Sequence, residues 1–134
     1  MKSKSFPVTL ALVLFLIAIV NGLAQYHHWY WTMRWFDMPM HFTGGAWLAG
    51  VALWARFFSG KFMGEMRSFQ HVLLWGLGVA LCVGVVWELY EMVVSYLTGK
   101  HINDMVDTAS DVFMDGLGAL LVSVGVWFRS RNNK

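Results

Sequence analysis

The chain has 134 residues, of which 57% are hydrophobic, 16% aromatic and only 13% charged. This composition excludes an ordinary soluble domain and indicates an integral membrane protein. The formal net charge is +2 and the basic residues form no stripe, so we expect no nucleic-acid partner. A single cysteine, Cys82, excludes both an intramolecular disulfide and a thiolate metal site.

The first predicted element is an apolar helix over residues 6–24, which contains no charged residue. Its length approaches the roughly 20 residues that a membrane-spanning helix needs. Lys2 and Lys4 before it, and the small residues Gly22 and Ala24 near its end, also resemble a secretory signal peptide. Because further apolar segments follow, we favour an uncleaved membrane helix that faces lipid.

The second predicted span covers residues 38–58 and follows a group of aromatic residues. We expect that group to form a girdle at the membrane surface, on a short surface helix: Trp29, Tyr30, Trp31, Trp35 and Phe36. Asp37 and His41 stand at the start of this span. Their spacing of four residues places both side chains on one face of the helix.

The third and fourth predicted spans, over residues 69–97 and 106–128, carry most of the acidic side chains. Glu88 and Glu91 are three residues apart, and Asp107, Asp111 and Asp115 follow one another at intervals of four. Each set therefore shares one helix face. The four spans together predict an all-α fold, namely a single domain (residues 1–134) that forms a compact four-helix transmembrane bundle.

The basic residues predict the orientation of this bundle, because Lys and Arg near span ends prefer the cytoplasmic side. Most of them fall on one side of the predicted membrane: Lys2, Lys4, Arg56, Lys61, Arg67, Arg129, Arg131 and Lys134. Only Arg34 and Lys100 fall on the other side. We therefore predict a multi-pass protein of the plasma (inner) membrane with both termini in the cytoplasm.

In this orientation, three spans bring their polar residues to a common depth. A helical rise of about 1.5 Å per residue places these residues roughly 5 to 15 Å below the outer surface: His41, Glu88, Glu91, Asp111 and Asp115. With Asp37 and Asp107 added, six carboxylates face one imidazole and the more peripheral Arg34. Either several carboxyl groups are protonated, or cations are bound.

We favour one or two divalent metal ions of unknown identity, because carboxylates and an imidazole on facing helices suit such ions. The candidate ligands are Asp37, His41, Glu88, Glu91, Asp107, Asp111 and Asp115. Asp107 is equally suited to cap the last helix, and Asp104 is better suited to that role. Asn21 is either a plain polar residue near a helix end or a hydrogen-bond partner of a site residue.

Three sequence runs resemble those of a known family: Asp37-Met-Pro-Met-His41-Phe-Thr-Gly-Gly, Trp87-Glu88-Leu-Tyr-Glu91 and Asp107-Thr-Ala-Ser-Asp111-Val-Phe-Met-Asp115-Gly-Leu-Gly-Ala. They are similar to the YjdF-type membrane proteins and, more distantly, to the VanZ-like family associated with teicoplanin resistance. Glu91 and Asp115 stand where VanZ-like proteins tend to have amides, so glycopeptide resistance is not implied. The resemblance implies the fold and the site but no particular reaction.

Three functions are compatible with such a site. We favour a metal-dependent membrane hydrolase or transferase that acts at the outer leaflet on a lipid or lipid-linked substrate, with Glu88 or Glu91 as the base. The second is translocation of a cation or proton by the same carboxylates. The third is a non-catalytic scaffold that assists another membrane protein. The sequence does not predict the oligomeric state.

Overall fold

The computed structural model describes residues 5–33, 35–59, 65–66, 68–99 and 105–132, and the only regular elements in these ranges are helices. In chain order they are α1 (Ser5–Tyr26), α2 (Trp29–Thr32), α3 (Asp37–Leu53), the π-helical segment η1 (Trp54–Phe58), α4 (Phe69–Thr98) and α5 (Met105–Asn132). The predicted all-α fold class is confirmed.

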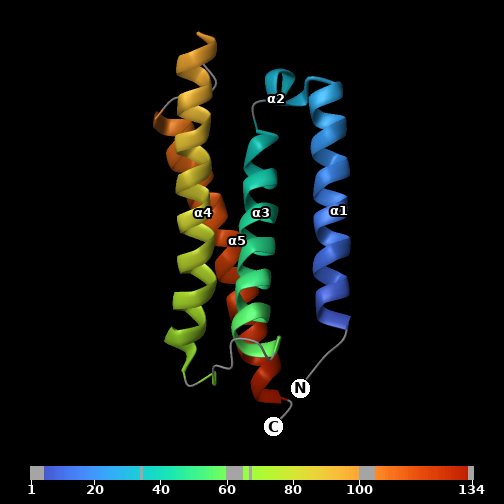
Figure 1. Cartoon of the computed structure of the whole chain (residues 1–134), viewed down its shortest axis with the longest axis vertical. Helices are drawn as coiled ribbons and strands as arrows, with labels where there is room; N and C mark the ends of the chain where they lie inside the picture. Colours follow the sequence, from blue (N-terminus) through green and yellow to red (C-terminus); the bar gives the residue numbers. More distant parts are fainter. Residues whose placement is uncertain (1–4, 34, 60–64, 67, 100–104, 133–134) are drawn as a thin grey trace.

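The long helices run alternately in opposite directions along one axis of the molecule, and α2 connects α1 to α3 at one end (Figure 1). α3 is the central helix, since it packs against each of α1, α4 and α5, and α4 also packs against α5. The end that carries α2 holds the last turns of α1 and α4 and the first turns of α3 and α5 (Figure 1). We call it the α2 end.

Three helices are long and apolar enough to cross a membrane: Phe6–Tyr26 in α1, Phe69–Thr98 in α4 and Met105–Asn132 in α5. α3 has 17 α-helical residues, which is near the lower limit for a span. It continues without a break into η1, where the N–H of Ser59 bonds the carbonyl of Trp54 at 2.9 Å. α3 and η1 together cover the segment predicted as the second span. The sequence did not predict that the last five residues of this segment form a π-helix.

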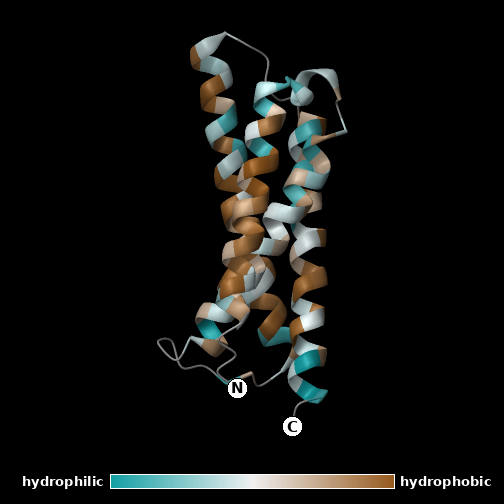
Figure 2. Ribbon diagram, turned by 90° about the vertical axis from the view of Figure 1, so that its right-hand side faces the viewer, coloured by the Kyte–Doolittle hydropathy of each residue, from teal (hydrophilic) through white to brown (hydrophobic). Residues whose placement is uncertain are grey.

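Apolar residues fill the middle of the long helices, and polar residues gather at their ends (Figure 2). The apolar stretch of α1 has no buried residue in its most hydrophobic window. Its exposed side chains include Val8, Leu12, Phe15 and Ile19, which recur at helical spacing along one face. A helix that presents this face to its surroundings requires an apolar solvent, as expected for a membrane protein.

The described basic residues, Arg56, Arg129 and Arg131, lie in the last turns of η1 and α5, away from the α2 end. The other residues on which the predicted orientation depends lie outside the described part of the chain: Lys2, Lys4, Arg34, Lys61, Arg67, Lys100 and Lys134. Asp104, the predicted cap, also lies outside it. The predicted location of the termini therefore stays a prediction.

Local sequence signals set both ends of α4. The hydroxyl oxygen of Ser68 accepts a hydrogen bond from the backbone N–H of His71 at 3.2 Å and caps the start of the helix. Gly99 ends it in the left-handed conformation, with φ of 66°, which glycine adopts without steric cost. These two ends place Glu91 and Glu88 about two and three turns from the α2 end of α4.

α3 and α5 approach each other so closely that their backbones touch. A methyl group added at Gly45 would collide with the backbone of Asp115, and one added at Gly118 would collide with the carbonyl of Phe42. Gly84 on α4 likewise leaves space for the Asp115 carboxylate. Since His41 lies one turn from Gly45, this crossing brings the His41 ring next to α5.

Candidate functional site

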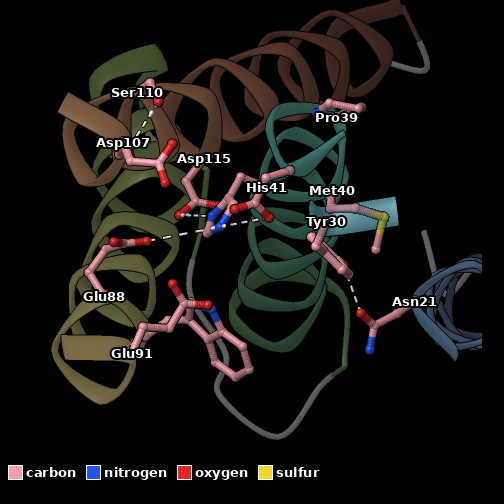
Figure 3. A network of polar contacts seen from close by, with 12 residues as sticks. Asn21, Tyr30, Pro39, Met40, His41, Glu88, Glu91, Asp107, Ser110 and Asp115 are labelled. Carbon is pink, nitrogen blue, oxygen red and sulfur yellow. Dashed lines mark hydrogen bonds and ion pairs between the residues drawn. The ribbon is translucent and has the colours of Figure 1, made fainter. Parts of the chain in front are cut away.

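His41 lies at the centre of a group of carboxylates that come from three helices (Figure 3). Its Nδ1 atom is 3.4 Å from Oδ2 of Asp115 on α5. Its Nε2 atom is 3.7 Å from Oδ1 of Asp37 on α3 and 3.9 Å from Oε1 of Glu88 on α4. The two ring nitrogens therefore face different partners.

The first turn of α3 positions two of these groups. Asp37 and His41 are separated by one helical turn, as their spacing predicted. Pro39 lies between them in the first turn, where its missing N–H removes no helical hydrogen bond. The proline therefore fits a helix start at Asp37.

Among the carboxylates that the structure describes, Asp111 is the most deeply buried, with 1% of its surface exposed. Within the described ranges, neither of its carboxylate oxygens has a hydrogen-bond partner. One ligand atom each from Asp37, His41 and Asp111 lies within 4.8 Å of the others. We call these three residues the metal triad, because side chains at this spacing could hold one ion.

The neighbouring carboxylates are also removed from solvent. The side chains of Glu88 and Asp115 are 3% and 6% exposed, respectively. Burying an ionised carboxylate costs several kcal/mol unless it is paired, hydrogen-bonded or bound to a cation. His41 offers at most one positive charge to the four carboxylates around it, so the site requires protons or an added cation.

Glu91 and Asp107, the two remaining predicted ligands, lie outside the metal triad. The indole N–H of Trp87 donates a hydrogen bond of 2.8 Å to Oε1 of Glu91. Asp107 lies in the first turn of α5, and its backbone carbonyl accepts a hydrogen bond of 2.7 Å from the Ser110 hydroxyl (Figure 3). Both side chains line the pocket that adjoins the triad.

This pocket has a volume of about 970 Å³ and is lined mainly by residues of α1, α3 and α4, with a few from α2 and α5. At the α2 end its lining is polar and includes Asp37, His41 and Glu91. Further along the helices the lining becomes apolar: Leu14 and Ile17 on α1, Leu48 on α3 and Val83 on α4. The pocket is therefore amphipathic along the long axis of the molecule.

Tyr30 on α2 is a site residue that the sequence suggested only as part of the aromatic girdle. Its hydroxyl donates a hydrogen bond of 2.8 Å to Oδ1 of Asn21 on α1. Burial, followed by the negative charges of Asp37 and Glu91, raises the pKa of Tyr30 to about 12. Its position depends on a turn in which His28 adopts a left-handed conformation, with φ of 59°, and no sequence pattern predicts that turn.

Comparison with curated proteins and with solved structures gives no match. A family described as predicted membrane protein (DUF2238) matches residues 3–132, a range that includes every candidate site residue. It is the family of the YjdF-type proteins that the motifs resemble, whereas the similarity to VanZ-like proteins stays a prediction. The chain therefore belongs to the DUF2238 family of predicted membrane proteins.

Proposed function

We propose that this chain is a four-span membrane protein that binds a divalent metal ion through Asp37, His41 and Asp111. The observation that carries this proposal is the mutual distance of 4.8 Å or less among their ligand atoms, together with the burial of Asp111. A buried carboxylate that accepts no hydrogen bond is stabilised most directly by a cation.

The hydrogen bond to Asp115 supports a specific role for each nitrogen of His41. If Nδ1–H is donated to Asp115, Nε2 would be the nitrogen available to hold the ion. It already faces Asp37, the second residue of the triad. One imidazole with carboxylate oxygens suits an intermediate or hard divalent ion such as Zn²⁺ or Mn²⁺.

The adjoining pocket supports an enzymatic role on a lipid or lipid-linked substrate. Asp37, His41 and Asp111 would hold the ion, and the chemistry that it would supply is the polarisation of a phosphoryl or carbonyl oxygen or the activation of water. Glu88 does not belong to the triad, and its Oε1 atom lies 3.9 Å from Nε2 of His41, close to where this reaction would take place. We assign it the role of general base in a hydrolase or transferase.

The position of the described arginines supports an outward-facing site. Arg56, Arg129 and Arg131 lie away from the α2 end, and arginines at span ends favour the cytoplasm. The metal triad then opens toward the outer leaflet, and α3 with η1 provides the fourth span. The substrate is a lipid that enters from that leaflet.

The distribution of buried polar groups favours binding over translocation. Besides Glu88, Asp111 and Asp115, the only buried polar side chain among the described residues is Ser123. Its hydroxyl donates to the carbonyl of Ala119 at 2.8 Å and is thus committed to its own helix. Among the described residues, no buried carboxylate besides Glu88 and Asp115 lies between the triad and the end of the molecule opposite the α2 end, so a cation that leaves this group of carboxylates has no next site along that path.

Elemental analysis of the purified protein tests the metal proposal. We expect about one divalent ion per chain in the native protein and in the control variant Glu65→Gln, which changes a carboxylate outside the site. His41→Ala and Asp111→Asn should lose it. A native protein without stoichiometric metal, after purification in the absence of chelators, would refute the proposal. Metal retained by both site variants would refute the ligand assignment.

Turnover of mixed lipids in reconstituted vesicles, beside a measurement of cation flux, tests the enzymatic part. Metal-dependent release of a lipid product, lost in Glu88→Gln, would support it. Cation flux without turnover would favour the translocation alternative instead.

A further inference from the structure

The wall of the pocket beside Glu91 has a chemistry different from that of the metal triad. Glu91 is held by the indole N–H of Trp87 at 2.8 Å, and both residues line the pocket. Tyr30 and Trp31 of α2 line the same polar end. We call Tyr30, Trp31, Trp87 and Glu91 the aromatic wall.

The charges around this wall select against an anionic headgroup that lacks a cation of its own. Asp37, Glu91, Asp107 and Asp115 all contribute to the pocket lining. No lysine or arginine lines it in the part of the chain that the structure describes. A single divalent ion at the triad leaves a surplus of negative charge in a low-dielectric site, and like charges there repel strongly.

Aromatic faces beside a carboxylate are suited to an ammonium ion. The face of an indole or phenol ring attracts a cation, and the carboxylate adds an opposite charge and hydrogen-bond acceptors. Trp87 is 51% exposed and Trp31 is 69% exposed, so their rings are accessible to a ligand. Tyr30 stays neutral below its pKa of about 12 and adds no negative charge of its own.

The remainder of the pocket is suited to an acyl chain. Leu14, Ile17, Leu48 and Val83 line it on the side away from the α2 end. α1, which forms one side of the pocket, has no buried residue in its most hydrophobic window. A lipid in this pocket would place its headgroup at the polar α2 end and its acyl chains along the apolar lining. Its long axis would then be parallel to the helices, as that of a lipid in a bilayer leaflet is.

We propose that the pocket binds a membrane lipid whose headgroup carries an ammonium ion, and that this ion contacts the Glu91 carboxylate and the face of the Trp87 ring. The inference rests on the proposed function in one respect, because the triad then lies beside the headgroup phosphate. The ammonium site itself is separate from the triad and does not require the metal. The lipid class is therefore ethanolamine-like rather than purely anionic.

Native mass spectrometry of the full chain in detergent tests this proposal, with dioleoyl lipids of identical chains as probes. We expect phosphatidylethanolamine to bind at least about tenfold more tightly than phosphatidylglycerol, both with and without EDTA. Glu91→Gln should abolish this preference, because it removes the charged partner of the ammonium ion. Glu65→Gln should keep the preference of the native protein.

Trp87→Phe gives a second test if Glu91→Gln folds poorly. It keeps an aromatic face but removes the N–H that holds Glu91, so we expect a reduced but detectable preference. Equal binding of the two lipids by the native protein would overturn the proposal, as would an unchanged preference in correctly folded Glu91→Gln. A lipid preference in a protein without metal would uphold this proposal and refute the metal site. A protein that binds metal but shows no lipid preference would uphold the metal site and refute this proposal.

Discussion

Nδ1 of His41 on α3 lies 3.4 Å from Oδ2 of Asp115 on α5, beside a close contact between the backbones of these two helices. The contact exists because Gly45 and Gly118 present no side chain where the two helices cross. It therefore couples the packing of the bundle to the orientation of the imidazole. Changes on either side of the crossing should alter both stability and metal binding.

Replacing the partner of the imidazole should weaken the proposed metal site without removing a proposed ligand. We predict that Asp115→Asn lowers the affinity for the divalent ion by about tenfold or more, because a neutral amide orients His41 less strongly. Competition with a metallochromic indicator measures the affinity. Glu65→Gln is the control, because it also removes one carboxylate but lies outside the site. An equal metal affinity in Asp115→Asn and Glu65→Gln would show that Asp115 does not orient His41.

The backbone contact itself can be tested with two adjacent glycines. Gly45→Ala places a methyl group against the backbone of Asp115, and we predict destabilisation of about 1 to 3 kcal/mol from overpacking. Gly44→Ala is the control, since no heavy atom lies within 4 Å of its added methyl group. Thermal unfolding in detergent should separate the two variants. A lower melting temperature for Gly44→Ala than for Gly45→Ala would contradict the helix crossing described here.

The burial of Asp111 predicts opposite effects in the presence and absence of metal. Asp111→Asn should raise the melting temperature of chelator-treated protein at pH 8, because it replaces a buried charge by a neutral amide of similar shape. The same variant should lose the rise in melting temperature that added metal gives the native protein. If metal stabilised the variant as much as the native protein, Asp111 would not be a ligand.

Tyr30 predicts a dependence of stability on alkaline pH. Because the folded state raises the pKa of Tyr30 to about 12, the folded state binds this proton more tightly than the unfolded chain does. Its contribution is complete below the ordinary tyrosine pKa of about 10 and is lost as the pH rises toward about 12. The melting temperature of the native protein should therefore fall more steeply across this range than that of Tyr30→Phe.

Below pH 10, Tyr30→Phe should cost only about 0.5 to 1.5 kcal/mol, for the lost hydrogen bond to Asn21. Tyr26→Phe is the matched control, because Tyr26 is 79% exposed at the end of α1. Parallel alkaline profiles for native protein and Tyr30→Phe would show that the Tyr30 phenol is not buried as described.

Much of the fold follows from the apolar runs in the sequence, because a membrane requires each span to satisfy its own backbone hydrogen bonds as a helix. The spacing of Asp37 and His41 likewise predicts their shared face. That Asp111 joins them, while Glu91 faces Trp87 instead, depends on how α3, α4 and α5 rotate and cross. This rotation is determined by close contacts such as Gly45 with Asp115, which periodicity does not specify.

The features that the sequence did not predict, namely the π-helical segment and the contact between Tyr30 and Asn21, depend on irregular backbone conformations. The π-helical end of α3 results from a hydrogen bond between Ser59 and Trp54, and neither residue type requires it. Tyr30 reaches Asn21 only because His28 turns the chain in a left-handed conformation. The pocket is lined by residues from α1, α2, α3, α4 and α5, so its amphipathic lining is visible only in three dimensions.

X-ray absorption spectroscopy of the protein, on whichever divalent metal elemental analysis identifies, tests the central claim most directly. The account predicts one imidazole nitrogen and otherwise oxygen ligands, with no sulfur, and it predicts loss of the imidazole signal in His41→Ala. A native spectrum with oxygen ligands alone, or an imidazole signal that persists in His41→Ala, would contradict a site built on Asp37, His41 and Asp111.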